Sequence, residues 1–293
     1  MNYPDTVQFL YALGNEVKTA KLGLDRVEAL AGTLGAPQRG RRFVHVAGTN
    51  GKGSVCAMIE AGLRAAGLRT GLFTSPHLLE PVERIRINSV PVEPERFAAA
   101  FARVHETAEQ MLDVGQLDLH PTYFETVVAM ALLTFQEAEV DVAVLETGLG
   151  GRLDATNIVL PEVAVVTPVD YDHEALLGKS IEAIALEKAG ILKLGVPAVF
   201  ARQRPEAAAV LERRAGELGV PIVHTADFAV RELEMHPGGS RFLATGPGTL
   251  RIDCPLAGEH QVENALAAAA ALLRIGVPPA AIERGIAGTR WPG

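Results

Sequence analysis

The most telling part of the chain is the run His45-Val46-Ala47-Gly48-Thr49-Asn50-Gly51-Lys52-Gly53-Ser54. Its apolar start is typical of a β-strand, its glycines of a tight turn, and the residues after it of a helix. Backbone N–H groups of such a turn fold around an anion, and the positive N-terminal end of the helix adds to the attraction. Lys52 supplies a charge for the outer phosphates, and Thr49 or Ser54 a hydroxyl for phosphate or Mg²⁺. The run therefore predicts a polyphosphate site.

This turn departs from the usual phosphate loop, in which Gly and four residues precede Gly-Lys-Ser/Thr. Val46 stands where the first glycine belongs, and Gly53 separates Lys52 from Ser54. The departure argues against an ordinary kinase or GTPase. A purely structural strand–turn–helix without a ligand stays open as the alternative, although three glycines around one lysine favour the phosphate site.

Composition excludes several classes of protein. With 27 Lys and Arg against 35 Asp and Glu, the net charge is −8, so we expect no general attraction for nucleic acid or anionic membranes. No apolar run approaches the ~20 residues that span a bilayer. Residues 1–5 lack the pattern of a secretion signal, and Cys56 and Cys254 are too few for a disulfide framework. We therefore expect a cytoplasmic protein, with both cysteines buried.

Helical and strand-like segments alternate along most of the chain. The predicted helices cover residues 24–34, 55–66, 97–111, 124–135, 181–189, 207–218 and, as a last long helix, 262–275. The predicted strands cover residues 43–47, 71–73, 142–145, 163–166, 197–201 and 220–223. Near-continuous apolar strands suit a parallel sheet covered on both faces, so we predict a doubly wound, mostly parallel α/β fold. Turn residues and a period of two predict a small antiparallel β meander at about 226–256, within one domain covering residues 1–293.

Polar groups follow three of these strands, at the end of a parallel sheet where ligands bind. They are Thr74-Ser75-Pro76-His77, the segment from Glu146 to Asn157, and Asp170-Tyr171-Asp172-His173. Glu146 ends an apolar strand, where a carboxylate is costly unless a cation offsets it, so it is the best Mg²⁺ ligand. Ser75 and His173 are its candidate companions. Ser75 as a turn or helix-capping hydroxyl and His173 as a hydrogen-bonding loop residue stay open.

The glycines at 148–151 permit a ligand to approach the backbone, although a glycine cluster alone is a weak signal. Asp154 and Asn157 place polar groups near Glu146, or simply form the turn. We interpret His45 and His77 as packing or loop histidines.

The ordered set of motifs resembles folylpolyglutamate synthase and its bifunctional relative dihydrofolate synthase, of the Mur ligase superfamily. The resemblance runs from about residue 20 to the end of the chain. Some of the motifs are shared with all Mur ligases, but the set as a whole is specific to the folate branch. The motifs are Leu22–Val27, Gly48–Ser54, Thr74–Leu78, Thr122–Glu125, Glu146–Asn157, Asp172-His173 and Glu187–Ile191.

The resemblance implies roles for individual residues. The phosphate loop would hold ATP through Gly48, Thr49, Asn50, Gly51, Lys52, Gly53 and Ser54. Ser75, Glu146 and His173 match magnesium positions, and Lys52, Lys188 and His173 would take part in catalysis. Lys188 matches a lysine that CO₂ carbamylates, which would let it engage a second Mg²⁺. An unmodified, solvated or salt-bridged Lys188 is the alternative.

The resemblance also implies where the other ligands bind. Asn264 would contact the nucleotide base, or else be an ordinary polar residue near a helix N-terminus. The pteridine pocket would be lined by Thr122, Tyr123, Phe124, Glu125, Leu153, Asp154 and Ala155, with Thr19–Leu22 as further contributors. Phe124 would stack on a flat heterocycle, or else belong to the core.

The implied reaction is ATP-dependent amide formation through an acyl phosphate. A folate or pteroate carboxylate would attack ATP, and L-glutamate would then displace phosphate, catalysed mainly by positioning and charge neutralisation. Family members continue with a second, glutamate-binding domain, so we expect this chain to be a truncated, monomeric ligase. A non-catalytic ATP-binding module and, less favoured, a small-molecule phosphotransferase are the alternatives.

Overall fold

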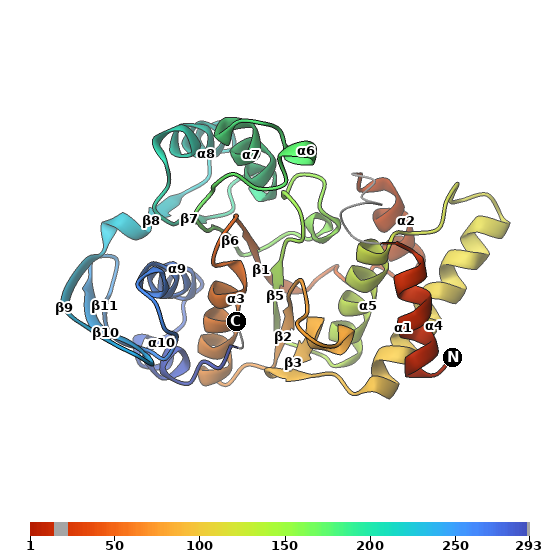
Figure 1. Ribbon diagram of the computed structural model, residues 1–293, viewed down its shortest axis with the longest axis horizontal. Coiled ribbons are helices and arrows are strands. Elements are labelled where there is room, and N and C mark those ends of the chain that lie inside the picture. Colours follow the sequence, from red (N-terminus) through yellow and green to blue (C-terminus); the bar gives the residue numbers. More distant parts are fainter. Residues whose placement is uncertain (15–22, 292–293) are drawn as a thin grey trace.

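A computed structural model describes residues 1–14 and 23–291, which form two β-sheets with helices around them (Figure 1). The larger sheet has the strand order β4-β3-β2-β5-β1-β6-β7-β8, and the smaller has the order β11-β10-β9. The strands are β1 (Arg42–Ala47), β2 (Thr70–Phe73), β3 (Ile85–Ile87), β4 (Val90–Pro91), β5 (Val142–Glu146), β6 (Val163–Val166), β7 (Ala198–Phe200), β8 (Ile222–His224), β9 (Ala229–His236), β10 (Gly239–Thr245) and β11 (Thr249–Cys254). The helices are α1 (Tyr3–Ala12), α2 (Asp25–Thr33), α3 (Lys52–Ala65), α4 (Pro94–Asp113), α5 (Tyr123–Glu137), α6 (Glu174–Leu177), α7 (Ile181–Lys188), α8 (Pro205–Glu217), α9 (His260–Arg274) and α10 (Pro279–Ala287).

Strand β1 lies at the centre of the large sheet and pairs in parallel with β5 and β6. In this register Val46 is opposite Glu146 on one side and Val165 on the other. Strands β2, β7 and β8 continue the parallel pairing, and β3 and β4 add an antiparallel edge. The carboxyl ends of β1, β2, β5 and β6 therefore meet at one edge of the sheet, where open α/β folds bind their ligands.

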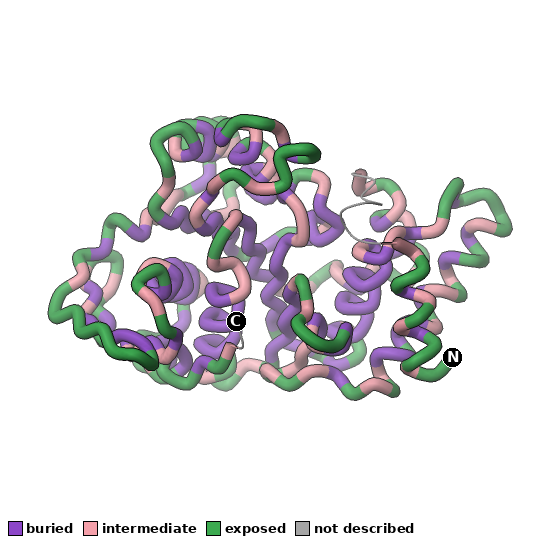
Figure 2. Tube along the Cα trace, in the orientation of Figure 1, coloured by how far each residue is buried: buried purple, intermediate pink, exposed green. Residues whose placement is uncertain are grey.

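Helices cover both faces of this sheet because alternate strand residues point to opposite sides. Val44 and Val46 pack with α3 and α9, whereas Phe43 packs on the side of α2, α4 and α5. Helices α7 and α8 cover β6 and β7. Figure 2 shows the burial that results, with the central strands buried and the outer turns of the helices exposed.

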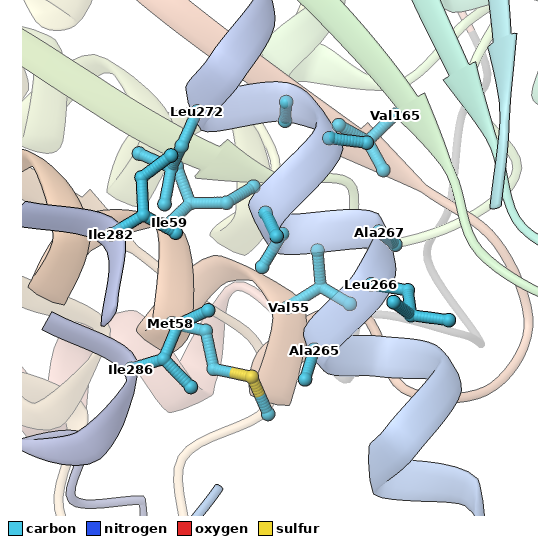
Figure 3. Packing of buried hydrophobic residues seen from close by; sticks show 14 of the residues in the cluster. Val55, Met58, Ile59, Val165, Ala265, Leu266, Ala267, Leu272, Ile282 and Ile286 are labelled. Carbon is cyan, nitrogen blue, oxygen red and sulfur yellow. The ribbon is translucent and has the colours of Figure 1, made fainter. Parts of the chain in front are cut away.

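The helix after the phosphate loop is held in a tightly packed core. Figure 3 shows Val55 and Met58 of α3 among side chains of α9 and α10, such as Ala265 and Ile286. Alanines on α9 and paired glycines let these helices approach closely, since a Cβ on Gly285 would lie 2.4 Å from the Cα of Gly62. The start of α3, and with it the phosphate loop, is thereby fixed to the sheet.

The predicted doubly wound fold and the separate antiparallel meander are confirmed. The meander covers Ala229–Cys254, close to the expected 226–256. Cys56 and Cys254 are both free and buried. No helix in the described part of the chain is long and apolar enough to cross a bilayer.

Four features of the fold were not predicted. They are α1, the β3–β4 hairpin, α6 and α10, the last of which is a short helix after the last long helix α9. Each of these elements is short, so it contains too few apolar residues for a helical or strand periodicity to be recognised from the sequence.

Candidate active site

Two glycines set the shape of the loop between β1 and α3. Gly48 has a φ of +147° and Gly51, the N-cap of α3, a φ of +83°. A Cβ on Gly48 would lie 1.9 Å from the hydroxyl of Thr167, and one on Gly51 would lie 2.3 Å from Oδ1 of Asn264. Both the backbone conformation and the lack of space therefore require glycine at these positions.

Two lysine ammonium groups converge on this loop. Lys52 Nζ donates to the carbonyl oxygens of Gly48 and Thr49, both at 3.1 Å, and Lys188 Nζ donates to the same Gly48 oxygen at 2.7 Å. Lys188 is almost fully buried, and its Nζ lies 4.0 Å from Oδ2 of Asp172. Burial, reinforced by the charge of Lys52, lowers the pKa of Lys188 to about 8. The pair concentrates positive charge at the carboxyl end of β1, as a phosphate site needs.

Interlocking glycine segments hold Lys188 in this place. A Cβ on Gly190 would lie 2.3 Å from the Cα of Arg152, and one on Gly151 would lie 2.9 Å from the carbonyl oxygen of Glu187. An ion pair of 2.8 Å between Arg152 and Glu187 joins the same two segments. The glycines that follow Glu146 therefore dock the end of α7 against the phosphate loop.

Glu146 ends β5 beside β1, and its side chain is buried. Its Oε2 accepts a hydrogen bond of 3.1 Å from the backbone N–H of Ser75. Burial raises the pKa of Glu146 to about 7, and the nearby charge of Lys52 opposes that rise. A buried carboxyl of this kind fits a divalent cation, whose charge would offset the cost of burying the carboxylate.

His173 lies between β6 and α6, next to Asp172. It has a left-handed backbone (φ +43°) before α6, and its side chain is 40% exposed. Its Nε2 lies 3.3 Å from Oδ1 of Asp172, the residue whose other oxygen faces Lys188. The structure thus connects His173 to Lys188 through Asp172, while Ser75 is the companion placed against Glu146.

Asp154 uses its oxygens to shape the glycine loop. Oδ2 accepts hydrogen bonds of 2.9 Å from the backbone N–H groups of Gly148 and Leu149, and Oδ1 accepts from the backbone and hydroxyl of Thr156. Asn157 likewise donates to backbone carbonyl groups. The bonds of Asp154 shape the turn, as one alternative predicted, whereas Asn157 joins the turn at Arg152 to the distant residue Gly190.

The segment Thr122–Glu125 forms the start of α5. Thr122 and Glu125 make a reciprocal capping box, and the carboxylate of Glu125 also binds Arg26 with a closest N–O distance of 3.0 Å. Tyr123 is buried and stacks on Tyr11, with ring centroids 6.2 Å apart.

Phe124 is the member of this segment that reaches the glycine loop, since a Cβ on Gly148 would lie 2.5 Å from its ring. Leu153 is partly exposed and Ala155 is buried in the core with α5. Contact of these residues with a pteridine stays a prediction, and Thr19–Leu22 lie outside the described residues.

The N-terminal turn of α9 docks on the phosphate loop. Asn264 donates to Gln261 at 2.9 Å, and Gln261 donates to the hydroxyl of Ser54 at 3.3 Å. The ring of Trp291 covers Gly53, where a Cβ would lie 2.8 Å from it. Asn264 is thus at the nucleotide loop, as its predicted role requires, and that role stays a prediction.

Some residues of this site were not singled out from the sequence. Thr167, Gln261 and Trp291 contact the loop, and the carbonyl of Pro168 accepts from the backbone N–H of Thr49 at 3.0 Å. Thr167 and Pro168 directly follow β6, so the rule that ligands bind at strand ends could have found them. Trp291 does not follow a strand, so that rule could not have placed it at the phosphate loop.

His45 and His77, which we interpret from the sequence as packing or loop histidines, both bond to neighbouring side chains. His45 is fully buried and bonds to the hydroxyl of Thr156 at 2.8 Å, and burial lowers its pKa to about 3. His77 lies in the loop after β2 and accepts a hydrogen bond of 2.8 Å from Arg84.

Comparison with known proteins places this site in context. Residues 94–272 match the Mur ligase middle domain. Over its full length the chain is 37% identical to the folylpolyglutamate synthase of Lacticaseibacillus casei, covering 70% of that protein. It is 40% identical over 263 residues to the dihydrofolate synthase/folylpolyglutamate synthase of Mycobacterium tuberculosis, covering 85% of this chain and 54% of that protein.

Solved structures give the same result. An FPGS–AMPPCP–folate complex superposes with a TM-score of 0.91 at 36% identity, covering 100% of this chain and 73% of the other. M. tuberculosis folylpolyglutamate synthase complexed with ADP and AMPPCP also has a TM-score of 0.91 at 36% identity, with 67% of its chain covered. The similarity includes the phosphate loop, which lies outside the Mur ligase match at 94–272.

Proposed function

The chain belongs to the Mur ligase superfamily and, within it, to the folylpolyglutamate synthases, and we propose that it carries the MgATP and folate sites for ATP-dependent ligation of L-glutamate. The acceptor would be folate, dihydropteroate or both. In this reaction the acceptor carboxylate attacks the γ-phosphate and releases ADP. The amino group of glutamate then attacks the acyl phosphate, loses a proton and expels phosphate.

One observation carries this proposal: Lys52 and Lys188 share the Gly48 carbonyl oxygen, beside a buried Glu146 on the neighbouring strand. The ammonium group of Lys52 would neutralise part of the charge of the triphosphate and of the phosphate that leaves, and Lys188 lies where its modified side chain would meet Lys52. Two hydrogen bonds to the loop fix the position of the Lys52 ammonium group, and charge held in a fixed position lowers a barrier. The chain needs no nucleophile of its own, because the attacking groups belong to the substrates.

The residues present fit Mg²⁺. Glu146 is a buried carboxyl whose raised pKa reports the cost of its charge, and Ser75 adjoins it. When bound, Mg²⁺ would neutralise phosphate charge and orient the transferred group. Glu146 and Ser75 would hold this ion, and we keep His173 as a ligand candidate on the side of Asp172 and Lys188, where a second ion would bind.

We also propose that Lys188 carries a carbamate in the active protein. With a pKa of about 8, roughly a tenth of the Lys188 amine is neutral near pH 7, and this form attacks CO₂. The Nζ–C bond forms, one C–O electron pair moves to oxygen, and Nζ releases a proton. The resulting anion would turn a repulsive neighbour of Lys52 into a partner and supply oxygen ligands for the second Mg²⁺. After addition of ¹³C-bicarbonate, a carbamate carbon resonance absent from Lys188→Met supports this step, and identical spectra contradict it.

The acceptor would lie on the Phe124 side of the site. Phe124 rests on the glycine loop that follows Glu146, so a heterocycle stacked on its ring would point its carboxylate chain toward the phosphate loop. Arg26 and Glu125 hold the start of α5 that presents this ring. We further propose a cytoplasmic location, which the two free, buried thiols support. We also propose that the protein is a monomer.

The deciding experiment separates nucleotide binding from turnover. Calorimetric titration with AMPPCP and Mg²⁺ tests the site, and ADP release that depends on both a folate and L-glutamate tests the ligase. Lys52→Met should remove binding, whereas the exposed Lys179→Met should leave it unchanged. Binding without turnover would favour the non-catalytic ATP-binding module, and absence of binding would refute both.

A further inference from the structure

Three side chains converge on α4 beside Phe9 of α1 and do not belong to the phosphate loop. His105 and Glu109 lie one turn apart on this helix, and His120 lies in the segment that leads into α5. Nδ1 of His105 is 3.4 Å from Nε2 of His120, and Oε1 of Glu109 lies 3.9 Å and 3.7 Å from these nitrogens. Among the described residues, no other group of three or more His, Cys, Asp or Glu side chains has ligand atoms this close.

These separations match the coordination shell of a small metal ion. Ligand atoms about 2.1 Å from a tetrahedral zinc ion lie roughly 3.4 Å from one another. The His105–His120 distance already has this value, and the two distances to Glu109 need only a small movement of a flexible side chain that is 52% exposed. Two imidazoles and one carboxylate, with a fourth position left to water, form a set that suits zinc.

The tautomer of His120 also suits a ligand. Its Nδ1 lies 2.8 Å from the carbonyl oxygen of Pro121, so Nδ1 carries the proton and donates it to that oxygen. Nε2 therefore presents its lone pair toward His105 and Glu109. A hydrogen bond from the second ring nitrogen to a carbonyl is the usual support of a metal-bound histidine.

His105 is fixed by aromatic packing. Its ring stacks on Phe101 with centroids 5.4 Å apart and contacts Phe9 of α1 at 4.5 Å. Both rings are thus oriented before a metal arrives, which reduces the cost of binding.

We propose that His105, Glu109 and His120 bind one divalent zinc-type ion. The ion would tie α4 to the segment that ends two residues before Thr122, the N-cap of α5. It would brace the helix that carries Phe124, at a distance from the phosphate loop. The competing arrangement is an ordinary hydrogen bond from Nδ1 of His105 to Nε2 of His120, with no metal.

Cobalt spectroscopy distinguishes the two. Metal-free protein is titrated with Co²⁺ in excess Mg²⁺, which occupies the nucleotide site. We expect one equivalent with the intense visible absorption of four-coordinate cobalt, displaced by Zn²⁺. His120→Ala should weaken binding at least about tenfold, since even supporting groups contribute that much. His236→Ala, on the exposed strand β9, is the matched control and should bind like the wild type.

A second measurement guards against loss of folding. Glu109→Gln changes an exposed side chain and should fold normally, yet it should lose the Zn²⁺-induced rise in melting temperature that the wild type shows. A weak octahedral spectrum, or Zn²⁺ stabilisation equal in wild type, Glu109→Gln and His120→Ala, would overturn the proposal.

Discussion

Replacing Lys188 by Met should make the protein more stable near neutral pH while removing its ligase function. Lys188 is an almost fully buried ammonium group whose pKa falls from an ordinary 10.5 to about 8. That difference corresponds to about 3 kcal/mol of unfavourable charge burial at pH values below about 8. Because folding lowers the pKa, this penalty is absent above about pH 10.5, where Lys188 is neutral in both states. It grows as the pH falls and is complete below about pH 8.

The substitution also removes a hydrogen bond, which sets the net magnitude. Lys188 donates to the Gly48 carbonyl at 2.7 Å, a bond worth about 1 kcal/mol net. That oxygen keeps a second donor, Lys52 at 3.1 Å, so it is not left unsatisfied. Met has nearly the same length as the lysine stem and leaves little cavity. We expect a gain of about 2 kcal/mol at about pH 7 that disappears near pH 10.

Urea unfolding in CO₂-free buffer, followed by circular dichroism at several pH values, measures this difference. Lys179→Met is the matched control, because Lys179 is exposed and its replacement should give a small, flat difference. Added bicarbonate should narrow the gap by stabilising the wild type only. If Lys188→Met is less stable than wild type at about pH 7, or the difference does not change with pH, the reasoning about charge burial is wrong.

Three further substitutions test the loop and its neighbours. Gly51 has a left-handed backbone, and Gly51→Ala places a Cβ 2.3 Å from Oδ1 of Asn264. Calorimetry should therefore show at least about tenfold weaker AMPPCP binding, and unchanged affinity would contradict the tight fit. Burial raises the pKa of Glu146 from 4.5 to about 7. The protonated side chain therefore contributes fully to the free energy of unfolding below pH 4.5, and this contribution is lost as the pH rises through about 7. Without divalent ions, wild type should therefore lose up to about 3 kcal/mol relative to Glu146→Gln between about pH 5 and pH 8, and Mg²⁺ should restore it; no Mg²⁺ effect in urea unfolding would argue against the metal role. Asp154→Asn weakens the bonds to Gly148 and its neighbour and should cost about 2 kcal/mol, measured by thermal unfolding beside the exposed Asp118→Asn; equal melting temperatures would contradict it.

Much of the fold and part of the site were predictable from local pattern. Apolar strands such as 142–145 and 163–166 read as buried parallel strands because they lack polar alternation. The loop at Gly48–Ser54 combines glycines, a lysine and a following helix within a few residues. Glu146 stood out because a carboxylate that ends an apolar strand must be compensated. These inferences needed only neighbouring residues, so the sequence was sufficient for them.

The remaining features depend on contacts between distant parts of the chain. Lys188 reaches Gly48 across 140 residues, and His105 meets His120 only because the segment after α4 turns back along the helix. Strand order and helix packing create such contacts, and no local period encodes either. The sequence alone favoured a solvated or salt-bridged side chain for Lys188, and its burial in the tertiary structure is what lowers its pKa. The sequence by itself thus determined the types of element and the residues at strand ends, while the tertiary structure decided which charges meet, because low-dielectric proximity exists only after packing.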